Sequence, residues 1–316
     1  MKDKATSELC LRARFVKFLY EYFKSNGGVT DHPAFFEEQL PFIVEAIISI
    51  QYYHNQILDQ KGGVNTPSTI NDNLITGNLL KDQFYRYLEQ LEMDANNRIT
   101  LIQHARSIFE YVDIGQYLEK HCNHYEAYKN KQYHHPFERT VNEFIQAEWI
   151  EEIVQIILEL VDLDADNQAY LRIYLQRIYL TNAALFNLVA VLMADMMDVE
   201  NSIKAKVVKF ATWFGIAQQM MNDNCDVVPS SLLFKNTVAK LVTDAQADLK
   251  NKCFTLPLVI HLKFCPSGII SNYLNDYKAN MQEEDFFDET IKSLSIFFSI
   301  TISKKVSEGF LFTINT

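Results

Sequence analysis

The sequence predicts an all-α protein, and three observations lead to that prediction. Glycine and proline are scarce, with 9 and 7 among 316 residues, and few chain breakers favour long helices over many short strands. Apolar residues recur along most segments with the three-to-four-residue spacing of a helix. The sequence contains neither a Pro/Ser-rich linker nor an internal repeat, so we expect one domain over residues 1–316.

Each predicted helix follows from one such apolar run, and breakers beside it set its ends. Pro41 stands near the start of the second run and Gly62-Gly63 just past its end, where these residues are usual. We expect breaks near Gly115 and near Leu256-Pro257. In order, the runs are Leu11–Phe23, Phe35–Leu58, Thr69–Leu91, Arg98–Tyr128, Val141–Leu160, Ala169–Met197, Ser202–Cys225, Asn236–Leu262 and Glu284–Glu308. The stretch SIFFSITIS in the last run has strand propensity, but we predict helix there.

The bulk composition narrows the class of protein. With 48% apolar and 22% charged residues, the chain is typical of soluble globular proteins, and its net charge of −11 argues against a non-specific nucleic-acid surface. The five cysteines are scattered without a CxxC pair, which favours a reducing cytoplasm over a disulfide framework. The longest apolar run, Ala183–Met197, is interrupted by Asn187 and Asp195 and is too short to span a bilayer. We therefore expect a cytoplasmic protein that is not transmembrane.

Two short stretches, HNQILD (54–59) and QMMNDNCD (219–226), carry most of the functional information. Each places oxygen-bearing side chains one helical turn apart: Asn55 with Asp59, and Asn222 with Asp226. Residues four apart on a helix point the same way. Two such helices facing each other across a cavity would form a cage of oxygen ligands, which is how proteins hold Mg²⁺ beside a diphosphate. The stretches therefore predict a magnesium site, although amides stand where carboxylates would bind more strongly.

The segment Lys120–Thr140 is polar and rich in histidine, and it also contains Cys122. Histidine and cysteine are zinc ligands. Their spacing here matches no established zinc site, so we interpret the segment as a solvated loop.

At the two acidic stretches the chain resembles the trans-isoprenyl diphosphate synthase family, the polyprenyl synthetases. HNQILD aligns with the family's first aspartate motif, HDDxxD, of which Asp59 keeps the final aspartate. GIAQQMMNDNCD is similar to the second motif, GxAFQxxDDxxD, with Asn222 in place of the leading aspartate. The residues that match the second motif are Gly215, Ala217, Gln219, Asp223 and Asp226.

Further elements of the family follow the same order along the chain. LRARF places Arg12 and Arg14 on the two arginines of the family's basic opening turn. KGGVNTPST resembles the Arg-Arg-Gly-x-Pro-Thr loop, with both arginines lost and Lys61 as the nearby cation. Lys235 follows the second motif, and DLKNKCFTLP resembles the late DxxxxKxTLP element with Lys252 as its lysine.

The resemblance implies the isoprenoid synthase fold, a bundle of about ten or more helices around a deep apolar central cavity. The family joins an allylic diphosphate to isopentenyl diphosphate, Mg²⁺ bridges the aspartates and the diphosphate, and members are commonly dimers. The resemblance implies catalytic roles for Asp59, Asp223 and Lys252. It also implies substrate-binding roles for Arg12, Arg14, Lys61, Gln219 and Lys235, and metal-binding roles for Asn55, Asp59, Asn222, Asp223 and Asp226.

Several changed positions weaken the implied site. Asn55, Gln56 and Asn222 each remove a negative charge, and Leu11 and Thr181 stand where the family has lysines. One charge pair about 4 Å apart is worth up to about 4 kcal/mol at an effective dielectric constant near 20, before desolvation. Losses of this size put the two-substrate condensation in question.

Three functions therefore stay open. The first is Mg²⁺-assisted ionisation of an allylic prenyl diphosphate, as in a prenyltransferase or a terpene cyclase. Asn222-Asp223 partly resembles the asparagine-led motif of the terpene cyclases. The second is a non-catalytic homologue that pairs with an active synthase, and the third is a carrier of a long apolar ligand. Either of the first two predicts a homodimer or a heteromer. The aromatic residues Tyr52, Tyr53, Trp213 and Phe214 could line the cavity, but aromatic residues more often form the core.

Overall fold

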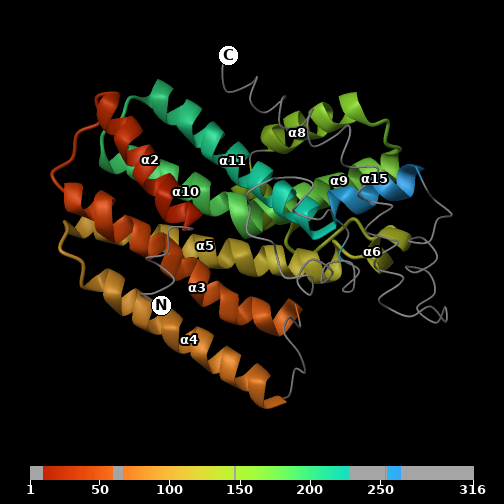
Figure 1. The fold of residues 1–316 in the computed structure, drawn as a ribbon, viewed down its shortest axis with the longest axis horizontal. Coiled ribbons are helices and arrows are strands. Elements are labelled where there is room, and N and C mark those ends of the chain that lie inside the picture. The colour runs from red at the N-terminus through yellow and green to blue at the C-terminus, as the bar shows by residue number, and fades with distance from the viewer. Residues whose placement is uncertain (1–9, 60–66, 146, 228–252, 254, 265–316) are drawn as a thin grey trace. The chain divides into compact units, whose positions relative to one another are not determined.

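The computed structural model describes residues 10–59, 67–145, 147–227, 253 and 255–264 (Figure 1). Within these ranges the chain is helical and has no strand; His124 and Cys253 form an isolated antiparallel bridge. The predicted all-α class is therefore confirmed. The α-helices are α2 (Leu11–Ser25), α3 (Leu40–Asp59), α4 (Pro67–Glu89), α5 (Ala95–His121), α6 (Tyr125–Lys129), α7 (Glu138–Phe144), α8 (Ala147–Leu160), α9 (Ala165–Ile178), α10 (Ala184–Met196), α11 (Asn201–Val227) and α15 (Leu256–Phe264); two π-helical turns are η1 (Phe35–Gln39) and η2 (Tyr179–Ala183).

The chain divides into two compact units. The first unit comprises Met1–Asp113 and Asn182–Gly215, and the second comprises Ile114–Thr181 and Ile216–Thr316. The expectation of a single domain over residues 1–316 stays a prediction.

The first unit is built around the apolar faces of α2, α3, α4 and α10. Helix α3 packs against both α2 and α4, as Figure 1 shows, and α10 packs against α2. Fully buried side chains, among them Leu19, Phe23 and Ile47, fill the space between these helices. Burial of each such side chain contributes about 1.5–3 kcal/mol, so this cluster holds the unit together.

The second unit has α9 at its centre, packed against α8 and α15. Asp164 caps the N-terminus of α9, because its carboxylate accepts a hydrogen bond of 2.8 Å from the backbone N–H of Asn167. Tyr170 and Tyr174 are both fully buried on this helix. A central helix buried on several sides needs partners for its polar groups, and those partners define the site described below.

Two sequence predictions about helix ends need correction. Gly115 does not break a helix but lies inside α5, where a Cβ would come 2.6 Å from Thr181 Cγ2, so the glycine permits close packing. The break falls instead between α5 and α6. The run Val141–Leu160 is two helices, α7 and α8, because Ile145 has an extended backbone conformation.

The segment Lys120–Thr140 is only partly the solvated loop that the sequence predicts. It contains α6, and Cys122, Asn123, Tyr125 and His135 are buried. Burial lowers the pKa of His135, which favours its neutral form. The predicted break near Leu256-Pro257 agrees with the start of α15. Residues 236–252 of the run Asn236–Leu262, and the run Glu284–Glu308, lie outside the described residues.

One helical stretch, Ala165–Met196, is long and apolar enough to cross a membrane by length and composition alone. Of its apolar window, 78% is buried inside the protein. Core helices pass the same test, so the stretch is weak evidence for a membrane span.

Candidate functional site

The second acidic stretch lies on α11, and its Asp223 side chain is buried. This side chain is only 1% exposed and belongs to a buried polar network in the second unit. Asp223 Oδ2 accepts a hydrogen bond of 2.8 Å from the Tyr174 hydroxyl and another of 3.0 Å from Arg177 Nη2. Asp223 Oδ1 accepts one of 2.7 Å from Gln219 Nε2, one turn earlier on α11. Both carboxylate oxygens are thus engaged by protein donors.

Arg177 holds this network together. Its side chain is 6% exposed, and Nη1 also donates a hydrogen bond of 3.0 Å to Glu119 Oε2 on α5. Its guanidinium lies 5.2 Å from the centre of the Tyr174 ring, at cation–π distance. Because Tyr174 and Arg177 are three residues apart on α9, they present both donors to α11 from one helix face.

The sequence analysis missed Arg177, although the sequence contains a signal. Arg177 lies in the apolar run YLQRIYL, and arginine is almost never fully buried unless it is paired. An arginine inside such a run therefore predicts a buried acidic partner. The pattern alone does not say which carboxylate that partner is.

The first acidic stretch lies at the end of α3 in the first unit. His54 Nε2 and Asn55 Oδ1 are buried and have no hydrogen-bond partner among the described residues. A Cβ on Gly77 of α4 would lie 2.5 Å from His54 Nε2, so α3 and α4 approach closely here. The carbonyl oxygen of Asn55 is therefore available to accept a hydrogen bond or contact a cation. Asp59 ends α3, and its side chain lies outside the described residues.

The two arginines of the basic turn point in different directions on α2. Arg12 is turned inward, and its Nη2 donates a hydrogen bond of 3.0 Å to Asn182 Oδ1 in η2. Asn182 in turn donates one of 2.7 Å to the carbonyl oxygen of Gly215 on α11. Burial lowers the pKa of Arg12, and nearby Glu45 raises it. Arg14 is exposed, because residues two apart on a helix do not share a face.

The remaining predicted site residues are less informative. Asn222 is half-buried on α11. Lys61, Lys235 and Lys252, and the side chain of Asp226, lie outside the described residues. Trp213 is buried, and the Phe214 ring packs 5.0 Å from that of Phe15, as core residues do.

The described residues do not fit a magnesium ion. A ligand to Mg²⁺ must offer an oxygen lone pair in near-octahedral geometry, whereas three of the about four acceptor sites of the Asp223 carboxylate already take hydrogen bonds from the protein. The adjacent guanidinium of Arg177 would repel a second cation. Asn55 and Asn222 offer neutral amide oxygens only. Within the described ranges, no group of three or more His, Cys, Asp or Glu residues is suited to hold a metal.

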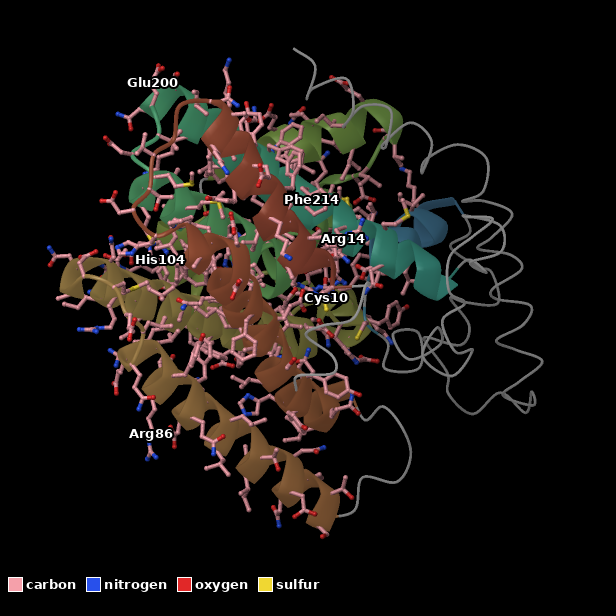
Figure 2. The ribbon with its side chains drawn as sticks, turned by 60° about the vertical axis from the view of Figure 1, so that its left-hand side comes forward. Cys10, Arg14, Arg86, His104, Glu200 and Phe214 are labelled. Atoms are coloured by element: carbon pink, nitrogen blue, oxygen red, sulfur yellow. The ribbon has the colours of Figure 1, made fainter. Side chains whose placement is uncertain are left out.

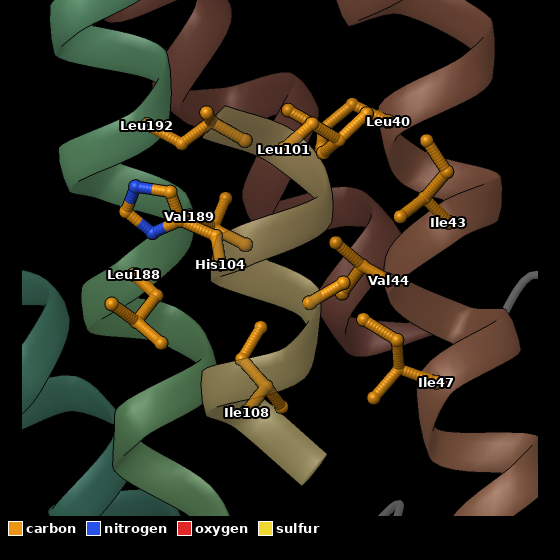
Figure 3. Close-up of a pocket in the computed structure, with 11 residues that line it drawn as sticks. Leu40, Ile43, Val44, Ile47, Leu101, His104, Ile108, Leu188, Val189 and Leu192 are labelled. Atoms are coloured by element: carbon orange, nitrogen blue, oxygen red, sulfur yellow. The ribbon is translucent and has the colours of Figure 1, made fainter. Parts of the chain in front are cut away.

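The described part of the first unit also contains a small apolar pocket between α3, α5 and α10 (Figure 3). Aliphatic side chains line it, including Ile43, Leu101 and Leu188, and His104 lies among them with its pKa lowered by burial. The cavity volume is about 10 Å³, room for about one water molecule and far below the 300–1,000 Å³ common for ligand pockets. It gives little support to the carrier interpretation.

Comparison with known proteins places the fold. No protein-family model and no curated protein matches the chain. Solved structures do match: geranylgeranyl pyrophosphate synthase from Lactobacillus brevis has a TM-score of 0.63 and 16% identity, over 98% of this chain and 79% of that one. Heptaprenyl diphosphate synthase from Staphylococcus aureus has a TM-score of 0.61 and 18% identity, over 98% and 80%.

A third structure is polyprenyl synthase from Caulobacter crescentus, solved with calcium and isoprenyl diphosphate. It has a TM-score of 0.62 and 16% identity, over 98% of this chain and 78% of that one. The chain therefore has the fold of the polyprenyl diphosphate synthases, and the resemblance drawn from the sequence is confirmed at the level of the fold.

Proposed function

We propose that the chain is a non-catalytic homologue of the prenyl diphosphate synthases that serves isoprenoid biosynthesis as the partner subunit of an active synthase. The network around Asp223 carries this proposal. The hydrogen bonds from Arg177, Tyr174 and Gln219 occupy most of the acceptor sites of the Asp223 carboxylate, and Mg²⁺ would have to compete with the guanidinium of Arg177 for the rest. The polar residues of the second motif then stabilise the fold instead of ionising a substrate.

The surface of α4 supports a partner. Leu74, Ile75 and Leu79 are 46%, 64% and 55% exposed on this helix. Ile75 and Leu79 are four residues apart and lie on one side of the helix, with Leu74 adjoining Ile75, so the three form one apolar stripe. Contiguous exposed apolar surface of this kind marks interfaces between proteins. The partner, an active synthase of the same fold, would cover the stripe.

A pyrophosphate-release assay tests the proposal. The purified chain is incubated with Mg²⁺ and geranyl or farnesyl diphosphate, with and without isopentenyl diphosphate, beside an active synthase as positive control. We expect no release from the chain alone. Release that Asp59→Ala or Asp223→Ala abolishes would refute the non-catalytic role.

A binding experiment tests the partner. The chain is co-expressed with a synthase from the same genome that carries both intact aspartate motifs, and the two are co-purified. Ile75→Asp and Leu79→Asp should abolish co-purification. Val29→Asp should not, since Val29 is 73% exposed away from α4 and serves as the matched control. Equal recovery with all three variants would contradict a partner on α4.

An enzymatic function is the second candidate, and the retained carboxylates of Asp59 and Asp226 favour it. Each ends its motif at the position where the family has aspartate. In this candidate, Mg²⁺ would be held by Asp59, Asp223 and Asp226. The prenyl diphosphate would be bound by Lys252 and by the basic residues Arg12, Arg14, Lys61 and Lys235. The same release assay distinguishes this candidate from a partner subunit.

A further inference from the structure

The exposed face of α2 carries aromatic side chains where a soluble helix normally carries polar ones. Phe18 and Tyr22 are 54% and 39% exposed, and Leu11 is 37% exposed. These residues are seven and four positions apart, so they lie on one side of the helix. The Phe18 and Tyr22 rings stack at 6.5 Å. The helix thus presents a row of apolar groups to its surroundings.

Helix α11 extends this apolar row within the first unit. The Phe210 ring lies 6.3 Å from the Phe18 ring and 6.2 Å from the Phe15 ring. Figure 2 labels Arg14 on α2 and Phe214 on the adjoining α11, and the rings of Phe15 and Phe214 are 5.0 Å apart. Behind the row, Phe15 packs on Phe186 of α10. The aromatic row is therefore supported by a rigid core.

Positive charges lie beside the aromatic row. Arg14 and Lys17 are exposed on α2, and Lys206 is exposed on α11, one turn before Phe210. No ion pair joins any of these three to another described residue. Glu21 is the acidic side chain that shares this side of α2, so the balance of charge is positive there. In a chain whose net charge is −11, this is a local reversal of sign.

We propose that this basic aromatic face, formed by Leu11, Arg14, Lys17, Phe18, Tyr22, Lys206 and Phe210, docks the protein on an anionic membrane surface. Aromatic rings enter the boundary between headgroups and acyl chains, while lysine and arginine reach the lipid phosphates. Each cation near an anionic leaflet strengthens binding about fivefold, and this attraction acts within about 8 Å at physiological salt. The acidic remainder of the chain is screened beyond that distance.

The charge pattern favours a membrane over a protein partner. Lysine is depleted at protein interfaces because its charge is costly to bury there. At a membrane surface the same lysine keeps its charge in the hydrated headgroup layer. A face that combines exposed aromatic rings with lysines that form no ion pair in the described part of the chain therefore fits lipid better than a second protein.

Vesicle sedimentation tests the proposal with the full chain and without any diphosphate ligand. The probes are vesicles of phosphatidylcholine alone and of an equimolar mixture of phosphatidylcholine and phosphatidylglycerol. We expect binding to the mixed vesicles, weakened by added salt, and much weaker binding to phosphatidylcholine. Lys17→Gln and Lys206→Gln should each lower the partition coefficient about fivefold, and Phe18→Ser about tenfold.

Two variants in the same unit serve as matched controls. Arg86→Gln removes an exposed cation from α4, and Ile99→Ser removes an apolar side chain that is 53% exposed on α5, close to the 54% of Phe18. Neither should change the partition coefficient, and circular dichroism checks that every variant is folded. Equal binding to both vesicle types overturns the proposal. An equal loss of vesicle binding in the control variants and in the variants of the basic aromatic face does so too. So does a dimer that Phe18→Ser dissociates while vesicle binding stays unchanged.

Discussion

Removing Arg177 is the sharpest test of the buried network. The ion pair joins Arg177 Nη2 and Asp223 Oδ2 at 3.0 Å, and the two side chains are 6% and 1% exposed. Arg177→Met leaves the Asp223 carboxylate buried with hydrogen bonds from Tyr174 and Gln219 but with no opposite charge. Removing one partner of a buried pair costs about 3–5 kcal/mol. We expect a loss of that size in the free energy of unfolding.

Urea unfolding followed by far-ultraviolet circular dichroism measures the effect. Arg139→Met is the matched control, because Arg139 Nε also lies 3.0 Å from a carboxylate oxygen, on Glu143. That pair is 93% and 59% exposed, so its removal should cost less than about 1 kcal/mol. The two variants share the same chemistry and distance and differ mainly in burial.

The double variant Arg177→Met, Asp223→Leu separates desolvation from packing. With both charges absent, no uncompensated charge stays buried between them, and Glu119, which is 24% exposed, can be hydrated. The double variant should therefore be more stable than Arg177→Met alone. If Arg177→Met unfolds at the same urea concentration as the wild type, the pair is not desolvated and the reasoning fails.

Two further predictions concern packing and pH. Gly215→Ala would place a Cβ 2.5 Å from the backbone Cα of Ala183, which cannot move aside like a side-chain tip. We therefore expect urea unfolding to show a loss of about 1–3 kcal/mol in the free energy of unfolding. In an unobstructed helix the same substitution would be stabilising. The pKa of Glu151 is lowered by its hydrogen bonds from Arg172, of 2.6 and 2.8 Å. This contribution to stability is present above the unfolded-state pKa near 4.3 and is lost as the pH falls through the folded-state pKa. Wild-type protein should therefore lose more stability than Glu151→Gln between about pH 6 and pH 3, and Glu148→Gln, which removes an exposed carboxylate of the same helix, should follow the wild type.

Helical periodicity predicted most of the described fold because each helix is encoded locally. The run Leu11–Phe23 became α2, Thr69–Leu91 became α4 and Ser202–Cys225 became α11, with ends shifted by a few residues. The failures arose where distant contacts override local preference. Gly115 is a poor helix former on its own, yet it lies inside α5 because Thr181 packs against it.

The candidate site was only partly predictable for the same reason. The spacing of Gln219 and Asp223 placed both on one side of a helix, and the structure joins them by a hydrogen bond of 2.7 Å. The partner that decides the chemistry of Asp223 is Arg177, 46 residues earlier in the chain. No local pattern links these two residues.

The sequence by itself determined the helical class, the positions of most helices and the residues that can carry charge or donate oxygen. These properties follow from the order of neighbouring side chains, which fixes what each helix buries. Only the tertiary structure decided that Asp223 is bound by Arg177 and Tyr174, that Arg12 is turned inward to Asn182, and that Arg14 is exposed beside Phe18. The free energy of a charge depends on its solvent exposure and on which opposite charge lies within a few ångströms, and the folded chain sets both.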